Sequence, residues 1–152
     1  MSIHLDGGSG DIVLKNADCA EEFDCSDRDA TPPGSVVVLN EDGWVGVCER
    51  AYDPRVVGVV SGAGGYRPAI VLGAGGTGSS SRVRVALTGR VACRVDATQR
   101  PVHVGDLLTT SSRPGHAMTA QDGSRAVGSI IGKAMGSLPD GAGLVPMLVM
   151  LR

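Results

Sequence analysis

The sequence is poor in aromatic residues, in basic charge and in long hydrophobic runs. Lys and Arg number 14 against 16 Asp and Glu, so the net charge is −2, which argues against a nucleic-acid-binding or membrane-surface protein. No apolar run reaches the roughly 18 residues that a membrane-spanning helix needs. The first residues have neither the basic region nor the apolar core of a secretory signal, so we expect no signal peptide and synthesis in the cytoplasm.

The four cysteines show no metal-binding spacing. Cys19 and Cys25 are separated by five residues, and no CxxC pair occurs. Cys48 and Cys93 lie in valine-rich segments, where a free thiol behaves as a small buried hydrophobe. Without a secretory signal the default compartment is reducing. We therefore expect free structural thiols, with a disulfide as the alternative, and neither a metal nor a cofactor.

Glycine and valine are abundant, with 23 and 20 residues in a chain of 152. Short runs rich in β-branched residues, bounded by Gly, Pro, Asp or Ser, recur along the chain and are typical of an all-β barrel or sandwich. The predicted strands are Val36–Leu39, Val56–Val60, Ala69–Leu72, Val83–Leu87, Arg90–Val95, Asp106–Thr110, Val127–Ile131 and Leu144–Leu151. The continuous apolar run of the second of these predicts a strand that is buried on both faces.

Only two stretches have helical character. The first is Asp18–Asp24, in which Asn16 or Asp18 is the expected N-cap and the acidic residues occupy the first turn. The second is a single turn near 122–125.

Two segments about 70 residues apart resemble each other. The first begins at Gly34 and the second 71 positions later at Gly105, and Gly58 and Gly128 are 70 positions apart. Each segment is predicted to form a strand, a tight hairpin, a second strand, a linker and a third strand. The glycine that opens each segment suits a turn with positive φ. This weak repeat predicts two pseudo-equivalent halves of a single barrel.

Residues 1–15 differ from the barrel-like domain predicted for 16–152. They read as two short strands around a glycine turn, with apolar residues alternating at Ile3, Leu5, Ile12 and Leu14. A lone hairpin is barely stable in water, so it must pack on the barrel or on copies of itself. A threefold stem would bury these four residues along its axis. We therefore predict an oligomerisation segment and a homotrimer.

Several motifs resemble those of the C-terminal β-domain of phage tail-fibre and tail-spike proteins, which also ends modular bacterial fibre-like proteins. The stretch Asn16–Phe23 matches N-A-D-x-A-E-x-F, and Val104–Ser111 matches V-G-D-L-L-T-T-S. Further similarity covers Tyr52–Gly62, Gly89–Val91, Pro114–Met118 and Ile131–Ala134, so that it extends over about 12–152. The segment before it is similar to the repeated β-stem of such proteins.

The resemblance implies a choice of two roles. One is a trimeric structural cap or attachment module of a phage-tail-like or bacterial fibre, with other fibre or virion proteins as further partners. The other is an intramolecular chaperone that trimerises a fibre and then cuts itself off at a Ser–Asp bond ahead of the domain. Here the only Ser–Asp bond, Ser26–Asp27, follows the Asn16–Phe23 motif. The resemblance therefore favours the structural, non-enzymatic role.

No pattern of residues indicates a catalytic site. His116, Asp106 and Ser111 lie near one another in sequence, but no G-x-S-x-G elbow orders a Ser–His–Asp arrangement. The acidic residues of 18–29 lack the glycine at the bend of a calcium loop. We expect no catalytic residue and no metal ligand.

The aromatic side chains Trp44, Tyr52 and Tyr66 are candidate contact residues. In a chain with only four aromatics, they are expected to be core or interface anchors. The alternative is that they are exposed platforms for sugars on a glycan-binding fibre tip. A virion protein that decorates a capsid as a trimer would suit the same glycine-punctuated β pattern.

Overall fold

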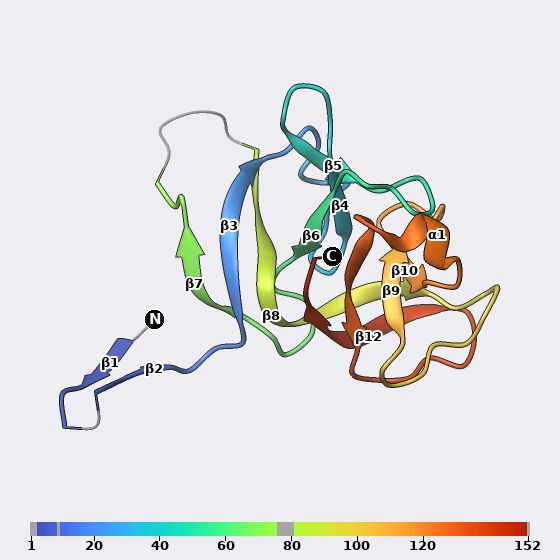
Figure 1. Ribbon diagram of the computed structural model, residues 1–152. Coiled ribbons are helices and arrows are strands. Elements are labelled where there is room, and N and C mark those ends of the chain that lie inside the picture. Colours follow the sequence, from blue (N-terminus) through green and yellow to red (C-terminus); the bar gives the residue numbers. More distant parts are fainter. Residues whose placement is uncertain (1–2, 9, 76–80, 152) are drawn as a thin grey trace.

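The computed structural model describes residues 3–8, 10–75 and 81–151, with the backbone alone for 3–6 and 11–13 (Figure 1). The described residues are nearly all β, as the sequence predicts. Their strands are β1 (Ile3–Asp6), β2 (Asp11–Leu14), β3 (Asp18–Asp24), β4 (Val36–Leu39), β5 (Val45–Val47), β6 (Val56–Val60), β7 (Pro68–Leu72), β8 (Arg82–Asp96), β9 (Leu107–Thr110), β10 (Ala117–Thr119), β11 (Ile130–Ala134) and β12 (Ala142–Val149). One short helix, α1 (Gly123–Ala126), lies between β10 and β11.

Most predicted strands are confirmed, and β4 and β6 have the predicted bounds. The predicted strands Val83–Leu87 and Arg90–Val95 are parts of one 15-residue strand, β8. Gly89, in the middle of β8, has φ of 103°. This glycine allows the strand to bend there and continue, where the sequence suggests a break.

The expectation of a helix over Asp18–Asp24 is wrong, because these residues form β3. This strand pairs with β7 in parallel and with β8 in antiparallel orientation. Asp18 is not a helix cap: it is 2% exposed and accepts a hydrogen bond from the hydroxyl of Ser61 at 2.9 Å. Pairing along both edges therefore outweighs the local helix signals. The turn predicted near 122–125 is confirmed as α1, which Asp122 caps by accepting from the Ser124 N–H.

The two similar segments fold alike. In the first, β4 pairs with β5 on one edge and β6 on the other, and in the second β9 pairs in the same way with β10 and β11. Gly34 and Gly105, which open the segments, have φ of 88° and 95°. The structural counterpart of Gly58 is Gly132, since Gly58 pairs with Val37 of β4 and Gly132 with Leu108 of β9. The sequence comparison assigned Gly128 instead, because the connection before β11 contains the extra helix.

Each half encloses a set of buried side chains, and β8 belongs to both halves. In the second half, β10, β9, β11, β12 and β8 form a barrel that a parallel pair, Ala117 with Val95, closes. In the first half, β5, β4, β6, β8 and β3 follow the same order, and an isolated parallel bridge joins Cys25 to Val45. The first part of β8 therefore pairs with β3 and β6, and the part after Gly89 with β12 and β10.

The core consists of two clusters on either side of β4 and β6. Val37 and Val57 belong to the smaller cluster, while Val36 and Val59 belong to the larger one. The prediction that Val56–Val60 is buried on both faces is thus confirmed, with only its first residue partly exposed. Aliphatic side chains and small residues make up almost all of this core, as the scarcity of aromatics requires.

The β1–β2 hairpin extends away from this body, beside the start of β3 (Figure 1). Its antiparallel register pairs Ile3 with Leu14 and Leu5 with Ile12. Since alternate positions of a strand share a face, the four positions lie on one face of the hairpin.

Candidate functional site

The residues predicted to form an oligomer interface lie on this hairpin. The structure places Ile3, Leu5, Ile12 and Leu14 at paired positions of β1 and β2. The side chain of Leu14 is partly exposed, while the side chains of the other three lie outside the described part of the structure.

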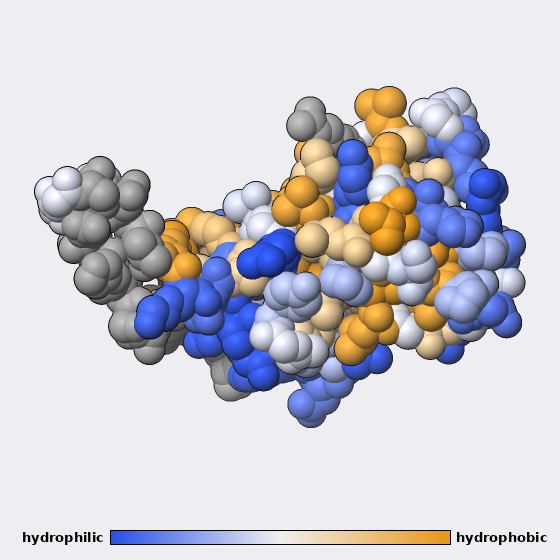
Figure 2. All heavy atoms as spheres, turned by 90° about the horizontal axis from the view of Figure 1, so that it is seen from below, coloured by the Kyte–Doolittle hydropathy of each residue, from blue (hydrophilic) through white to orange (hydrophobic). Residues whose placement is uncertain are grey.

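A second apolar surface, which sequence reasoning missed, lies on the outer side of the barrel. In β12, the exposed Leu144 and Leu148 alternate with buried residues. Leu148 pairs with Lys133 of β11, and Lys133 pairs in turn with the exposed Leu107 of β9. We call Leu107, Leu144 and Leu148 the β12 face. The available signal was that Leu144 and Leu148 lie at alternate positions of Ala142–Val149 and so share one face of the strand. The sequence does not show whether that face is buried or exposed to solvent. Figure 2 shows one side of the molecule, on which apolar side chains are scattered among charged ones.

The three candidate aromatics are in different surroundings. Trp44 lies in the β4–β5 hairpin and is 40% exposed. Tyr66 lies in the turn before β7 and is partly exposed. Tyr52, between β5 and β6, is partly buried. Of the three, Tyr52 is the one around which the described residues form a network of polar contacts.

Tyr52 connects the two halves of the protein. Its hydroxyl oxygen accepts hydrogen bonds from the N–H groups of Gln121 and Asp122, at 2.8 and 2.9 Å. The guanidinium carbon of Arg125 lies 4.6 Å from the centre of its ring, a cation–π contact. The backbone of Tyr52 has φ of 57°, a region that residues with a side chain rarely adopt. The hydroxyl and the ring of Tyr52 are thus both in contact with residues of the loop and helix that precede β11.

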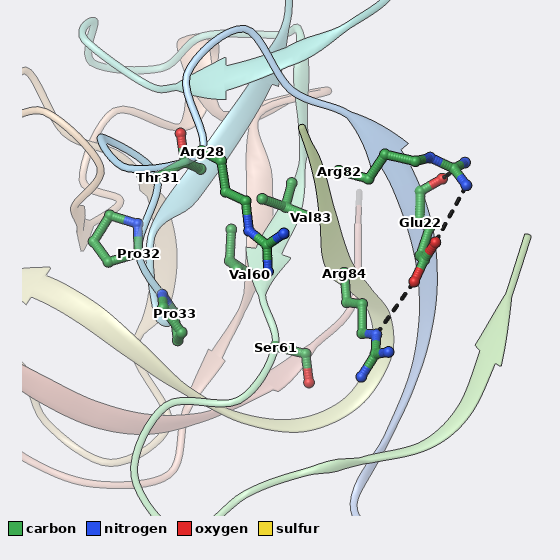
Figure 3. A pocket seen from close by; sticks show the side chains of 10 residues that line it. All are labelled: Glu22, Arg28, Thr31, Pro32, Pro33, Val60, Ser61, Arg82, Val83 and Arg84. Carbon is green, nitrogen blue, oxygen red and sulfur yellow. Dashed lines mark hydrogen bonds and ion pairs between the residues drawn. The ribbon is translucent and has the colours of Figure 1, made fainter. Parts of the chain in front are cut away.

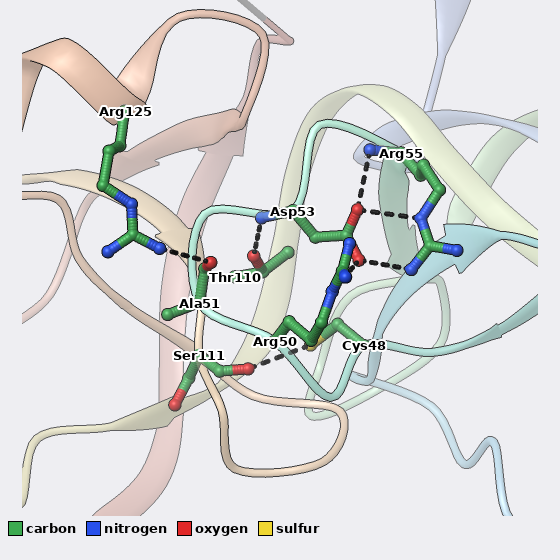
Figure 4. A network of polar contacts seen from close by, with 8 residues as sticks. All are labelled: Cys48, Arg50, Ala51, Asp53, Arg55, Thr110, Ser111 and Arg125. Atoms are coloured by element: carbon green, nitrogen blue, oxygen red, sulfur yellow. Dashed lines mark hydrogen bonds and ion pairs between the residues drawn. The ribbon is translucent and has the colours of Figure 1, made fainter.

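The neighbouring carboxylate, Asp53, is held by arginines (Figure 4). Its side chain is 1% exposed, and Arg55 donates to both of its oxygens, at 3.0 and 2.7 Å. Arg50 lies 3.6 Å away, and the Asp53 N–H donates to the hydroxyl of Thr110 at 2.7 Å. The hydrogen bond from Arg55 lowers the pKa of Asp53 to about 2 against the effect of burial. Asp53 therefore anchors the β5–β6 connection to β9.

A cavity of about 390 Å³ opens beside Tyr52, and we call it the Tyr52 cavity. Its wall comes from three segments: the β5–β6 connection, the bend after β8, and the strands and loops of β9 and β10. Polar side chains dominate this wall, among them Gln99, Arg100, Ser112, Thr119, Gln121 and Arg125. Thr119 is 9% exposed, and its hydroxyl oxygen is buried without a hydrogen-bond partner among the described residues.

A second cavity, of about 510 Å³, contains three arginines (Figure 3). Glu22 accepts from Arg82 at 3.2 Å and pairs with Arg84 at 3.4 Å. Arg28 points into the cavity beside Val60, without an ion pair among the described residues. We call this the arginine cavity. No sequence motif indicated it, because its arginines come from the loop after β3 and from β8.

The structure does not join the residues of the imagined Ser–His–Asp arrangement. The ring nitrogen Nδ1 of His116 lies 2.8 Å from the carbonyl oxygen of Pro114. Asp106 accepts from the backbone N–H of His103, and the hydroxyl of Ser111 accepts from the N–H of Arg113. Each of these groups thus serves a local turn.

The four cysteines are free thiols, as expected. Cys25, Cys48 and Cys93 are buried, and Cys19 is partly exposed. Burial raises the pKa of the Cys48 thiol to about 11 and raises that of Cys93 further. These two thiols are therefore protonated and inert at neutral pH.

Within the described ranges, no three or more His, Cys, Asp or Glu side chains gather as a metal site would require. In the same part of the chain, no helix has the length and apolar character to span a membrane.

Comparison with known proteins gives a likeness in fold. No protein-family model matches the sequence, and no curated protein is significantly similar to it. Among solved structures, pre-mature gene product 12 of bacteriophage phi29 matches with a TM-score of 0.62 and 16% identity, over 98% of this chain and 24% of that one. A C-terminal fragment of the same phage protein matches with a TM-score of 0.61 and 17% identity, over 88% of this chain and 100% of the fragment. The chain thus spans about a quarter of the length of the pre-mature phage protein, and its fold is similar to that of the C-terminal fragment.

Proposed function

We propose that this protein is a structural, non-enzymatic module of a phage-tail-like or bacterial fibre, in which it caps or attaches the fibre as a homotrimer. The observation that carries the proposal is the match of 88% of this chain to the whole of the phi29 gene product 12 C-terminal fragment. That fragment comes from a phage protein, and the motifs over 12–152 resemble fibre domains independently of it.

The β1–β2 hairpin supports self-association. It extends from the body (Figure 1), and its register gathers the apolar positions Ile3, Leu5, Ile12 and Leu14 on one face. A two-stranded hairpin needs a partner for its apolar face in water. Three copies side by side provide that partner, and the β12 face offers a further apolar surface for a neighbouring fibre protein.

Light scattering after size exclusion tests the assembly. We expect a mass near three times the 15.5 kDa of the chain. Leu5→Asp in the hairpin should give monomers, because a carboxylate in the apolar interior of a stem built from three hairpins has no partner. Val127→Asp is the matched control: Val127 is 86% exposed and lies in neither the hairpin nor the β12 face, so this variant should keep the mass of the wild type. A monomeric wild type would refute the homotrimer.

The site of incorporation has its own test. Copurification of the tagged protein with tail particles supports the fibre role, whereas copurification with capsids supports a decoration protein instead.

The alternative of a self-cleaving chaperone makes a distinct prediction about Ser26–Asp27. Ser26 lies just after β3, and its N–H donates to the carbonyl of Val45 in β5. The carbonyl of Asp27 accepts from the hydroxyl of Thr31 at 2.6 Å. Cleavage here would separate β3 from the rest of the body rather than release a stem. We expect only intact 15.5 kDa chains by mass spectrometry after prolonged incubation, and fragments ending at Ser26 would establish the alternative.

A further inference from the structure

The Tyr52 cavity has balanced charge. Asp96 and Asp122 oppose Arg100 and Arg125 in its wall. The arginine cavity, by contrast, has three arginines against one glutamate. A cavity with no excess of either sign favours a neutral ligand. Its volume of about 390 Å³ falls within the range of small-molecule sites.

The wall of this cavity carries hydrogen-bonding groups that the protein does not use. Among the described residues, the side chains of Gln99, Arg100, Ser112 and Gln121 make no hydrogen bond or ion pair. Amide, guanidinium and hydroxyl groups together supply both donors and acceptors. Such a mixture suits a ligand with many hydroxyl groups.

The buried hydroxyl of Thr119 is an independent indication of a ligand. Nine-tenths of the residue is buried, and its oxygen has no partner in the described structure. Buried polar groups of native proteins are nearly always hydrogen-bonded, so an exception calls for an explanation. Thr119 lies in the wall of the same cavity, so its unpartnered hydroxyl is close to the space that a ligand would occupy.

Tyr52 supplies an aromatic surface that is fixed in place. Two backbone N–H groups hold its hydroxyl, and the guanidinium of Arg125 lies over one face of its ring, 4.6 Å from the centre, so that ring and guanidinium line the cavity together. Its left-handed backbone conformation is costly, and such outliers concentrate at ligand sites. Met118 adds apolar surface to the same wall. A pyranose ring presents apolar C–H faces and a rim of hydroxyls, which matches a wall with both kinds of group.

We infer that the Tyr52 cavity is a binding site for a neutral saccharide, of the size of one or two sugar units. This function goes beyond the proposed fibre role and does not depend on the trimer. It selects Tyr52 from the three candidate aromatics and leaves the exposed Trp44 without a part in sugar binding.

Saturation-transfer difference NMR on the full-length protein tests the inference. The probes are galactose, N-acetylglucosamine and maltose, with glucuronic acid as the charged comparison. We expect at least one neutral sugar to receive saturation from the wild type. Gln99→Ala/Arg100→Ala should reduce that signal at least fivefold. Both residues are exposed and make no side-chain hydrogen bond to the described part of the chain, so the thermal midpoint should stay unchanged.

Two further variants separate binding from structure. Thr119→Val removes the unpartnered hydroxyl at nearly constant volume, so it should weaken sugar binding without lowering the thermal midpoint. Trp44→Ala removes the exposed aromatic outside the cavity and should keep the full signal. The inference is overturned if no neutral sugar binds the wild type, if only glucuronic acid binds, or if Trp44→Ala abolishes the signal while Gln99→Ala/Arg100→Ala retains it. The mass of every variant is also measured by light scattering. A loss of sugar binding can therefore be told apart from a loss of the homotrimer.

Discussion

Gly58 and Gly132 occupy the same place in the two halves of the protein, each against a carbonyl oxygen of the adjacent strand. A Cβ atom at Gly58 would overlap the carbonyl oxygen of Ala86 in β8. A Cβ atom at Gly132 would overlap the carbonyl oxygen of Leu148 in β12 and lie 2.6 Å from Cε of Met147. Both glycines thus let two strands approach closely, and this requirement, rather than a turn, explains a glycine inside each strand.

Gly132→Ala should lower the free energy of unfolding by more than about 2 kcal/mol, because the obstructing atom belongs to the backbone and cannot rotate away. Gly65→Ala is the control, since a Cβ atom added there would meet nothing within 4 Å and its φ is not positive. That control should be neutral or slightly stabilising. Denaturant unfolding followed by circular dichroism, at one protein concentration, measures both. Equal effects of the two substitutions would contradict the close approach of β11 and β12.

Tyr52→Phe should lower the free energy of unfolding by about 1 kcal/mol, because it removes the acceptor of two backbone hydrogen bonds from the loop before α1. Tyr66→Phe is the matched change, since no hydrogen bond of the Tyr66 hydroxyl occurs in the described structure, and it should be nearly neutral. Thermal unfolding compares the two. Hydrogen exchange should also accelerate at Gln121 and Asp122 in the first variant, and unchanged exchange there would show that the hydroxyl does not hold this loop.

Asp53 makes the stability depend on acid pH. Its folded-state pKa of about 2 lies below the value near 3.9 of an unfolded aspartate. A carboxylate with a depressed pKa stabilises the fold above its unfolded pKa, and this contribution is lost as the pH falls from about 4 towards 2. Between pH 4 and pH 2 the free energy of unfolding should therefore fall by about 1–2 kcal/mol less in Asp53→Asn than in the wild type. Denaturant unfolding at a series of pH values measures this difference. The exposed Asp29, which has no ion pair with any described residue, offers the control, because Asp29→Asn should leave the profile of the wild type.

Thiol accessibility should differ among the four cysteines. Ellman's reagent at pH 8 should label at most Cys19 quickly in the folded protein, because Cys48 and Cys93 are buried and their thiols have a raised pKa. In guanidinium without a reductant, four thiols per chain should react. A smaller number in the unfolded protein would indicate the disulfide that was the alternative.

The all-β class, most strand positions and the two-fold internal similarity follow from the sequence. The reason is that valine runs and the turn glycines Gly34 and Gly105 report local geometry directly. Asp18–Asp24 was misassigned because its acidic residues resemble a helix start, while the decisive partners, β7 and β8, lie far along the chain. The Tyr52 cavity was out of reach for the same reason. Its walls come from residues such as Gln99 and Thr119 that only the closure of the barrel brings together.

Because β8 serves both halves, neither half has a complete set of strands of its own. Gly89, at the crossing from one half to the other, also lies against the backbone of Ala17 and Asp18. Loss of either half would strip β8 of its neighbours on that side and expose the valines that it buries. The molecule should therefore melt as one cooperative unit, despite its duplicated plan, and neither half should be obtainable as an independently folding fragment.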